Sequence, residues 1–148
     1  LCIDETFVRE IYGLLRALEC LIYESALPYI DDELIDELKA VNEEIGLIAA
    51  GQTLSTGYID LNTKFHGLIM SRGGNSKAIE LYRYYHMLIR ALRKSYMPSI
   101  VRVQAVYSEH EELITALEKK DALAIKAAVD KHVGHAMENF LKVYAGQL

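Results

Sequence analysis

Residues 108–132 read SEHEELITALEKKDALAIKAAVDKH, and this stretch decides the fold. Apolar residues recur every three or four positions on both sides of Asp121, which is the spacing of amphipathic helices. Aspartate is a favoured N-cap residue, because its side chain accepts a hydrogen bond from a free backbone N–H of the first turn. The pattern therefore predicts one helix over about 99–119 and a second over about 122–144, with a histidine on the apolar stripe of each.

The rest of the chain shows the same helical period. Pro28 and Pro98 mark two junctions, because proline cannot continue a helix. No stretch alternates apolar and polar residues as a strand does. The sequence therefore predicts an all-α fold, an antiparallel bundle of about six helices that forms one domain over residues 1–148. The four other helices are expected at 4–26, from the N-cap Asp31 to about Gly51, at 57–71 and at 76–96.

Composition narrows the class of protein. The 148 residues carry a net charge of −5, so the chain lacks the basic excess expected of a surface that binds nucleic-acid phosphates. No apolar run reaches the length of a membrane span, and no signal pattern begins the chain. Cys2 and Cys20 are too far apart along a helix to pair. We therefore expect free thiols and a cytoplasmic protein.

Three histidines lie on or beside apolar stripes of three different helices. They are His66, His110 and His132, and Asn62 lies one turn before His66 on the same face. A single such histidine is usually a buried side chain that is hydrogen-bonded to a neighbour. Three directed into one small bundle favour a shared divalent metal ion, because neutral imidazole is a common metal ligand. His135, on the flank of its helix, is not part of this pattern.

The motifs of several enzyme classes are missing from the sequence. No histidine follows a glutamate by three residues, as di-iron bundles require. The chain has no His-Glu-x-x-His motif, no phosphate-binding glycine loop after a strand and no Gly-x-Ser-x-Gly elbow. The segment SRGGNS at 71–76 is best interpreted as a turn between helices. We therefore do not expect an enzyme.

Three segments carry a resemblance to a known family. They are LLRALE at 14–19, LNTKFHGLIMSRGGNSKAIEL at 61–81, and the stretch 108–132 quoted above. In these segments and in the order of its helices, the chain resembles the FCD domain, the effector-binding domain of FadR-type regulators in the GntR family of bacterial transcription factors.

The resemblance implies a metal ion at the floor of a cavity, held by Asn62, His66, His110 and His132. Zinc, nickel and manganese are the candidate ions. Most metal-binding members have aspartate where this chain has Asn62, and a neutral amide is a weaker ligand for a dication than a carboxylate. Asp60 does not replace it, because a residue six positions from His66 lies on another face of the helix.

The resemblance also implies a sensor of a small organic acid. An arginine would pair with the acid, with Arg16 as the first candidate and Arg90 as the second. Tyr82, Tyr85 and Tyr107 would line the pocket. DNA would be bound only through a winged-helix domain that precedes this domain in the family and is absent from this chain. A homodimer is expected, because palindromic operators require two-fold symmetry and the first and fourth helices carry surplus apolar residues.

Two alternatives remain open from the sequence. A metal-dependent enzyme would use the same histidines but would need a carboxylate base near the open metal position. A metal-free dimerisation module would instead leave the three histidines hydrogen-bonded to their neighbours.

Overall fold

The computed structural model describes residues 3–51, 57–93 and 98–144. Over these residues it contains six α-helices, one short 3-10 helix and no strand, which confirms the predicted all-α class. The elements are α1 (Glu5–Ala26), η1 (Leu27–Tyr29), α2 (Asp32–Ala49), α3 (Gly57–Ser71), α4 (Ser76–Leu92), α5 (Ile100–Glu118) and α6 (Ala122–Val143).

Side-chain caps fix where most of these helices begin. Five of the N-cap side chains accept a hydrogen bond from the backbone N–H three residues further on, and so satisfy one of the unpaired donors of the first turn. These caps include the predicted Asp31 and Asp121, whose carboxylates accept from Leu34 and Ala124. The other three are Asp4, Asn75 and Ser99.

One helix end differs from the prediction, and one short element was not predicted, whereas α1 ends at Ala26 as expected. Helix α4 stops at Leu92, where the backbone N–H of Arg93 is shared between the carbonyls of Ile89 and Arg90, and residues 94–97 lie outside the described residues. A 3-10 turn follows α1, because Pro28 has no N–H to continue the α-helical hydrogen bonds. The spacing of apolar residues in the sequence reveals neither the end of α4 nor the 3-10 turn.

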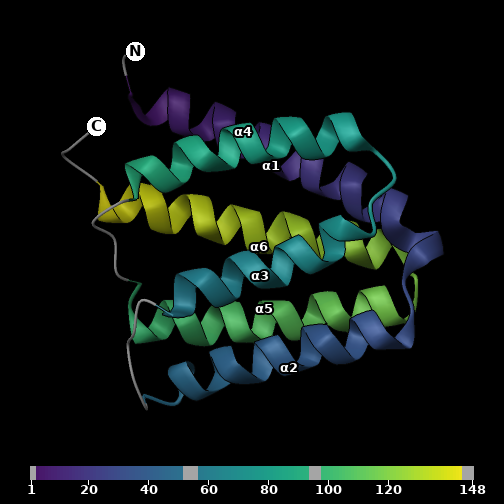
Figure 1. The fold of residues 1–148 in the computed structure, drawn as a ribbon. Helices are drawn as coiled ribbons and strands as arrows, with labels where there is room; N and C mark the ends of the chain where they lie inside the picture. The colour runs from purple at the N-terminus through teal and green to yellow at the C-terminus, as the bar shows by residue number, and fades with distance from the viewer. Residues whose placement is uncertain (1–2, 52–56, 94–97, 145–148) are drawn as a thin grey trace.

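Successive helices run in opposite directions, so the predicted antiparallel bundle is observed (Figure 1). Helix α5 packs between α2 and α6, and α1 packs against α6 on one side and α4 on the other. Helix α3 contacts both α2 and α1 and so crosses the bundle. This arrangement brings α1, α2, α3, α5 and α6 around one region of the interior.

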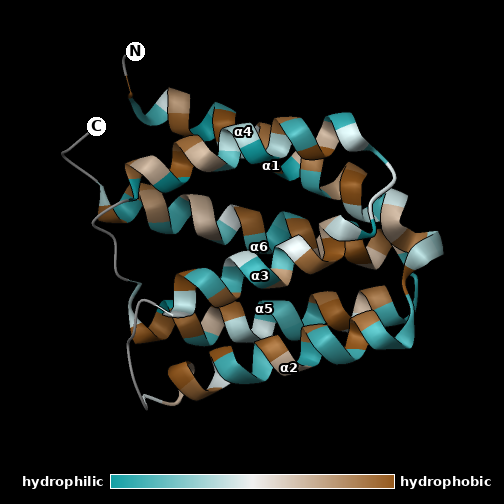
Figure 2. Ribbon diagram, viewed as in Figure 1, coloured by the Kyte–Doolittle hydropathy of each residue, from teal (hydrophilic) through white to brown (hydrophobic). Residues whose placement is uncertain are grey.

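Each helix carries an apolar stripe and a polar face, as the mixed colouring along each ribbon shows (Figure 2). The stripes form a core whose largest fully buried side chains include Tyr23, Phe65 and Phe140. Among the residues that the structure describes, six polar or charged side chains are also buried, and they lie together rather than scattered through the core. They are Glu19, Asn42, His66, Glu109, His110 and His132.

Two expectations from composition can be compared with the structure. None of the described helices combines the length and the apolar character needed to cross a membrane. Cys20 is a free, partly buried thiol, whereas Cys2 lies outside the described residues.

The contact between α2 and α5 depends on a glycine. A Cβ atom added at Gly46 would lie 2.8 Å from one ring carbon of Tyr107 and 3.1 Å from the next. The Tyr107 ring therefore occupies the space that a side chain on α2 would need. This contact holds Tyr107 beside a small apolar cluster that includes Ile45 and Val103, and not in the predicted ligand pocket.

We expect Gly46→Ala to lower the free energy of unfolding by about 1–3 kcal/mol, because the Tyr107 ring has to shift in a packed interface. Gly13→Ala is the matched control, since Gly13 lies within α1 and a Cβ atom there meets no atom within 4 Å. The control should be more stable than the native chain by about 0.5–1 kcal/mol. Urea unfolding of the three proteins measures both changes, and equal effects at both positions would contradict this account of the contact.

Candidate metal centre

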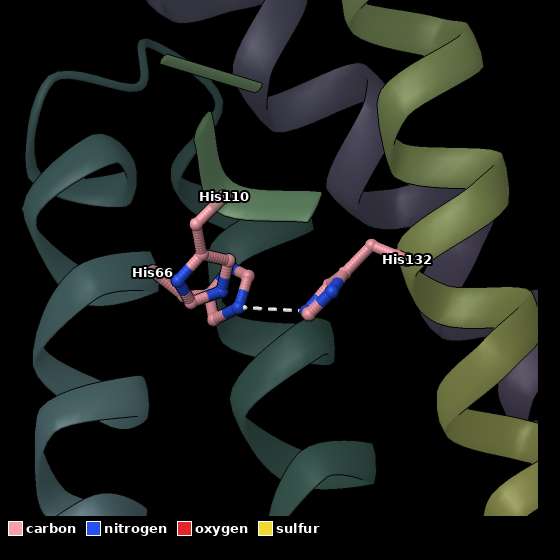
Figure 3. Close-up of side chains that lie close together, drawn as sticks. All are labelled: His66, His110 and His132. Carbon is pink, nitrogen blue, oxygen red and sulfur yellow. Dashed lines mark hydrogen bonds between the residues drawn. The ribbon is translucent and has the colours of Figure 1, made fainter. Parts of the chain in front are cut away.

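Helices α3, α5 and α6 each direct one buried histidine toward a common point (Figure 3). One nitrogen from each of His66, His110 and His132 lies within 4.8 Å of the other two. The Nε2 atoms of His66 and His132 are 3.1 Å apart. Two nitrogens bound to one zinc ion are separated by about 2.9 Å in octahedral and about 3.3 Å in tetrahedral geometry, given bonds of about 2.0–2.1 Å. The observed separation matches that of two ligands of one ion.

The outer nitrogens of His110 and His132 are held by acceptors from the protein. The Nδ1 atom of His110 lies 3.1 Å from Oδ1 of Asn42, and that of His132 lies 2.6 Å from Oε2 of Glu109. Because amide and carboxylate oxygens accept, both Nδ1 atoms carry the proton and each Nε2 atom presents a lone pair. The His110 ring is also stacked on Phe65, with ring centroids 3.8 Å apart.

His66 is held in a different way. Its Nδ1 atom lies 2.6 Å from the Tyr23 hydroxyl and 3.2 Å from Oε1 of Glu19. Burial, and then the charge of this carboxylate, raise the pKa of both Tyr23 and Tyr82. The outer nitrogens of all three histidines therefore have partners, an arrangement that fixes ring orientation in metal sites of known proteins.

The inner side of the cluster lacks partners. The Nε2 atom of His110 and the Oδ1 atom of Asn62 are buried without a hydrogen-bond partner among the described residues. If His66 and His132 both keep their protons on Nδ1, their Nε2 lone pairs face each other at 3.1 Å, which is repulsive unless a cation or a proton lies between them. Buried acceptors without partners are costly, by about 1–3 kcal/mol each. The donors present therefore fit a divalent ion bound by nitrogen and oxygen.

The local electrostatics keep His110 and His132 available as neutral ligands. Burial, and then the nearby His132 and His66, hold the pKa of His110 well below its ordinary value of 6.5. Burial also lowers the pKa of His132, although the hydrogen bond to Glu109 opposes this effect. Burial works to raise the pKa of Glu109, but hydrogen bonds from His132 and Arg102 outweigh it and lower that pKa to about 2. Glu109 is therefore a carboxylate at neutral pH and stays an acceptor.

A cavity with two lobes opens onto this cluster. The larger lobe, of about 260 Å³, has His132 and Asn62 in its wall, and the smaller lobe, of about 70 Å³, adds His66. The wall shared by both lobes consists of Asn62, His86, Arg90, Arg93, His132 and Ala136. A ligand in the cavity would lie directly beside the histidine nitrogens.

Two of the predicted ligand-binding residues line this cavity. Arg90 lies in the walls of both lobes, and Tyr82 lies in the wall of the smaller one. The Tyr82 ring is stacked on His86, with centroids 5.5 Å apart. Burial, followed by the nearby His66, lowers the pKa of His86 to about 4, so this imidazole is neutral at physiological pH.

The other three predicted ligand-binding residues are not brought to the cavity. Arg16 has a side chain that is 53% exposed and lies 3.7 Å from Asp130 on the surface. Tyr85 is partly buried against Tyr84 and is absent from the walls of both lobes. Tyr107 packs against α2, as described above. Arg16 directly follows Leu15 of the buried stripe and is therefore turned away from the core.

Four residues that orient the histidines were missed by the sequence analysis. They are Glu19, Tyr23, Asn42 and Glu109. Asn42 gave a usable signal, because it lies within the buried stripe of α2, four residues after Leu38. Glu109 gave none, because its partner His132 belongs to another helix.

Comparison with known proteins gives a consistent family. The sequence model described as the FCD domain matches residues 10–135 of this chain. An uncharacterized HTH-type transcriptional regulator of Bacillus subtilis (strain 168), YdhC, is 29% identical over 136 residues. That match covers 92% of this chain but only 61% of YdhC, so the chain spans less than two thirds of this relative. No solved structure matches the chain significantly.

We expect purified protein to bind one divalent ion, and His110→Ala to lose most of it, because this variant removes the most deeply buried of the three nitrogen ligands. The measurement is metal content by mass spectrometry after incubation with zinc, nickel or manganese salts and dialysis. His135→Ala is the control, since its exposed side chain contacts Glu109 but lies outside the cluster. Native protein that stays free of all three metals would contradict the site.

Proposed function

Since this chain belongs to the FCD domain family, we propose that it is the ligand-sensing domain of a transcriptional regulator. It binds a small organic acid in a metal-floored cavity and so controls DNA binding by a separate winged-helix domain. The name of the B. subtilis relative, an HTH-type transcriptional regulator, supports the regulatory part of this proposal. The acidic net charge of the chain agrees with DNA contacts being made by another domain.

One observation carries the metal part of the proposal. Three buried imidazoles are held by their Nδ1 atoms and converge through their Nε2 atoms, one of which has no partner among the described residues. His66, His110 and His132 would bind the ion, with Asn62 as a weak or water-bridged fourth ligand. A bound divalent ion supplies Lewis-acid positions for oxygen ligands, and four protein donors leave at least one such position open in an octahedral site.

The charges around the cavity support an anionic effector. Arg90, Arg93 and Arg102 line the larger lobe, and no aspartate or glutamate of the described residues does so. Arg102 is already paired with Glu109, at 2.9 and 3.2 Å, so its charge is compensated inside the protein. Arg90 and Arg93 add two further positive charges to the wall, and these favour a carboxylate in the cavity.

The positions of the buried carboxylates favour a sensor over an enzyme. Glu19 and Glu109 both contact Nδ1 atoms, on the side of the imidazoles away from the converging Nε2 atoms. A general base for a metal-bound substrate would have to reach the open side instead. Glu109 lines neither lobe, and Glu19, which lies in the wall of the smaller lobe, is engaged with Nδ1 of His66 at 3.2 Å. The metal-free dimerisation module is the other alternative, and the metal measurement described above distinguishes it from both.

We expect small organic acids to stabilise metal-loaded protein and to have no such effect after the ion is removed with EDTA. A ligand at one hundred times its Kd adds about 2.7 kcal/mol of stability, which corresponds to a rise in Tm of about 5–10 °C for a domain of this size. Thermal unfolding with a panel of acids measures the shift. Equal shifts with and without the ion would contradict a metal-floored site.

A homodimer is the second part of the proposed function. Helices α1 and α4 pack together, and both carry large apolar side chains that are exposed in the single chain. These side chains are Leu14, Leu21, Leu81, Tyr84 and Met87. Large apolar side chains exposed on two neighbouring helices are typical of an interface, and a two-fold dimer suits a regulator of palindromic sites.

We expect light scattering to give the mass of a dimer for the native chain and of a monomer for the double variant Leu21→Glu/Leu81→Glu. Both side chains are about half exposed in the single chain, so the substitutions should change its own fold little. Leu123→Glu, at an exposed position on α6, is the control and should remain dimeric. A native chain that is monomeric at all concentrations would contradict the proposal.

A further inference from the structure

The donors around the candidate metal position carry no charge of their own. His66, His110 and His132 are imidazoles held through their Nδ1 atoms, and Asn62 contributes only an amide oxygen. A divalent ion bound to these four groups would therefore keep its whole charge of two. The nearest carboxylates belong to Glu19 and Glu109, and both contact outer nitrogens of the imidazoles. Glu109 lines neither lobe of the cavity, whereas Glu19 lies in the wall of the smaller lobe.

A second cationic group faces the same space without a partner. Arg90 lines both lobes of the cavity, and its guanidinium makes no hydrogen bond or ion pair with the described residues. The other two arginines of the larger lobe are held by the protein. Arg102 is bound by Glu109, and Arg93 donates to the carbonyl of Ala136 at 3.4 Å and lies over the ring of Phe140.

From this distribution of charge we infer that the effector is a small dicarboxylate, with one carboxylate on the metal ion and the other paired with Arg90. The inference rests on the proposed function, whose ligand class it narrows. The ion and Arg90 together bring three positive charges, of which a monocarboxylate offsets one and a dicarboxylate two. Guanidinium and carboxylate form bidentate, charge-assisted pairs, so the second carboxylate has a defined partner.

The geometry of the cavity limits the size of this effector. Arg90, Asn62, His66 and His132 all line the same lobe of about 70 Å³, so the metal position and the guanidinium are separated by a short span. A short aliphatic diacid can place its two carboxylates on different partners. Inorganic phosphate carries a similar charge on one centre, so it serves as the comparison for two separated carboxylates.

The test compares acids that differ by one charge and little in shape. Metal-loaded protein is titrated calorimetrically with malonate, succinate and glutarate, with the monomethyl ester of each, and with inorganic phosphate. We expect at least one diacid to bind about tenfold or more tightly than its own monoester and than phosphate, because only the diacid satisfies both cations. Monoesters that bind as tightly as their diacids at all three lengths would overturn the inference, and so would phosphate that binds as tightly as the best diacid.

Two variants assign the preference to the residues named. Arg90→Gln should lower the affinity for the preferred diacid about tenfold and change the affinity for its monoester by no more than about twofold, because only the diacid uses the guanidinium. Asn62→Asp should raise the affinity for the metal ion. It should also reduce the ratio of the diacid affinity to the monoester affinity, because the added carboxylate lowers the positive charge of the site. Arg16→Gln, on the surface and outside the cavity walls, should change neither affinity.

The outcomes separate this inference from the function on which it rests. Metal-loaded protein that binds none of the acids would refute both. Protein that binds acids but responds to Arg90→Gln equally for diacids and monoesters would keep the sensor and reject the dicarboxylate. If Asn62→Asp leaves the ratio of diacid to monoester affinity unchanged, the uncharged metal ligands do not account for the preference for a diacid.

Discussion

The convergence of three imidazole Nε2 atoms in the core is the constraint on which the rest of the structure depends. Buried polar atoms require partners, and each ring meets this requirement on its outer side through a residue of the core. These partners are Tyr23 on α1, Asn42 on α2 and Glu109 on α5. The hydrogen bonds tie the registers of five helices to one point. A shift of any of them by one turn would leave several polar groups unpaired in an apolar interior.

Most of the fold follows from local signals in the sequence. The six helices were predictable because each has an apolar period near 3.6 residues, and caps such as Asp31 and Asp121 mark where some begin. The end of α4 and the 3-10 turn at Pro28 were not predicted, because a helix end depends on where its last carbonyls find donors. The order in which the helices pack was likewise set by tertiary contacts that no local pattern encodes.

The site was predictable only in part, for a geometric reason. The histidines were found because an imidazole on an apolar stripe is conspicuous, whereas their partners lie on other helices. The segment LLRALE illustrates the difficulty. Its arginine, Arg16, lies on the surface, while Glu19, four residues after the buried Leu15, shares the core-facing side and contacts His66. The two charged side chains of this segment point to different faces of the helix, so the carboxylate of Glu19 reaches the site and the guanidinium of Arg16 does not.

In the proposed site, the uncharged metal ligands would connect the binding of an acid to the stability of the domain. Glu109 stays ionised because Arg102 and His132 hold its pKa near 2, but it contacts the site only through an imidazole. In the proposed site no protein anion therefore touches the ion directly, and the acid effector is the first group to do so. Charge attraction in a mostly buried cavity is strong, since little water screens it. Binding of the acid would thus lower the free energy of the folded state by an amount set by RT ln(1 + [L]/Kd). In the proposed sensor, this is the free energy available to alter a separate DNA-binding domain.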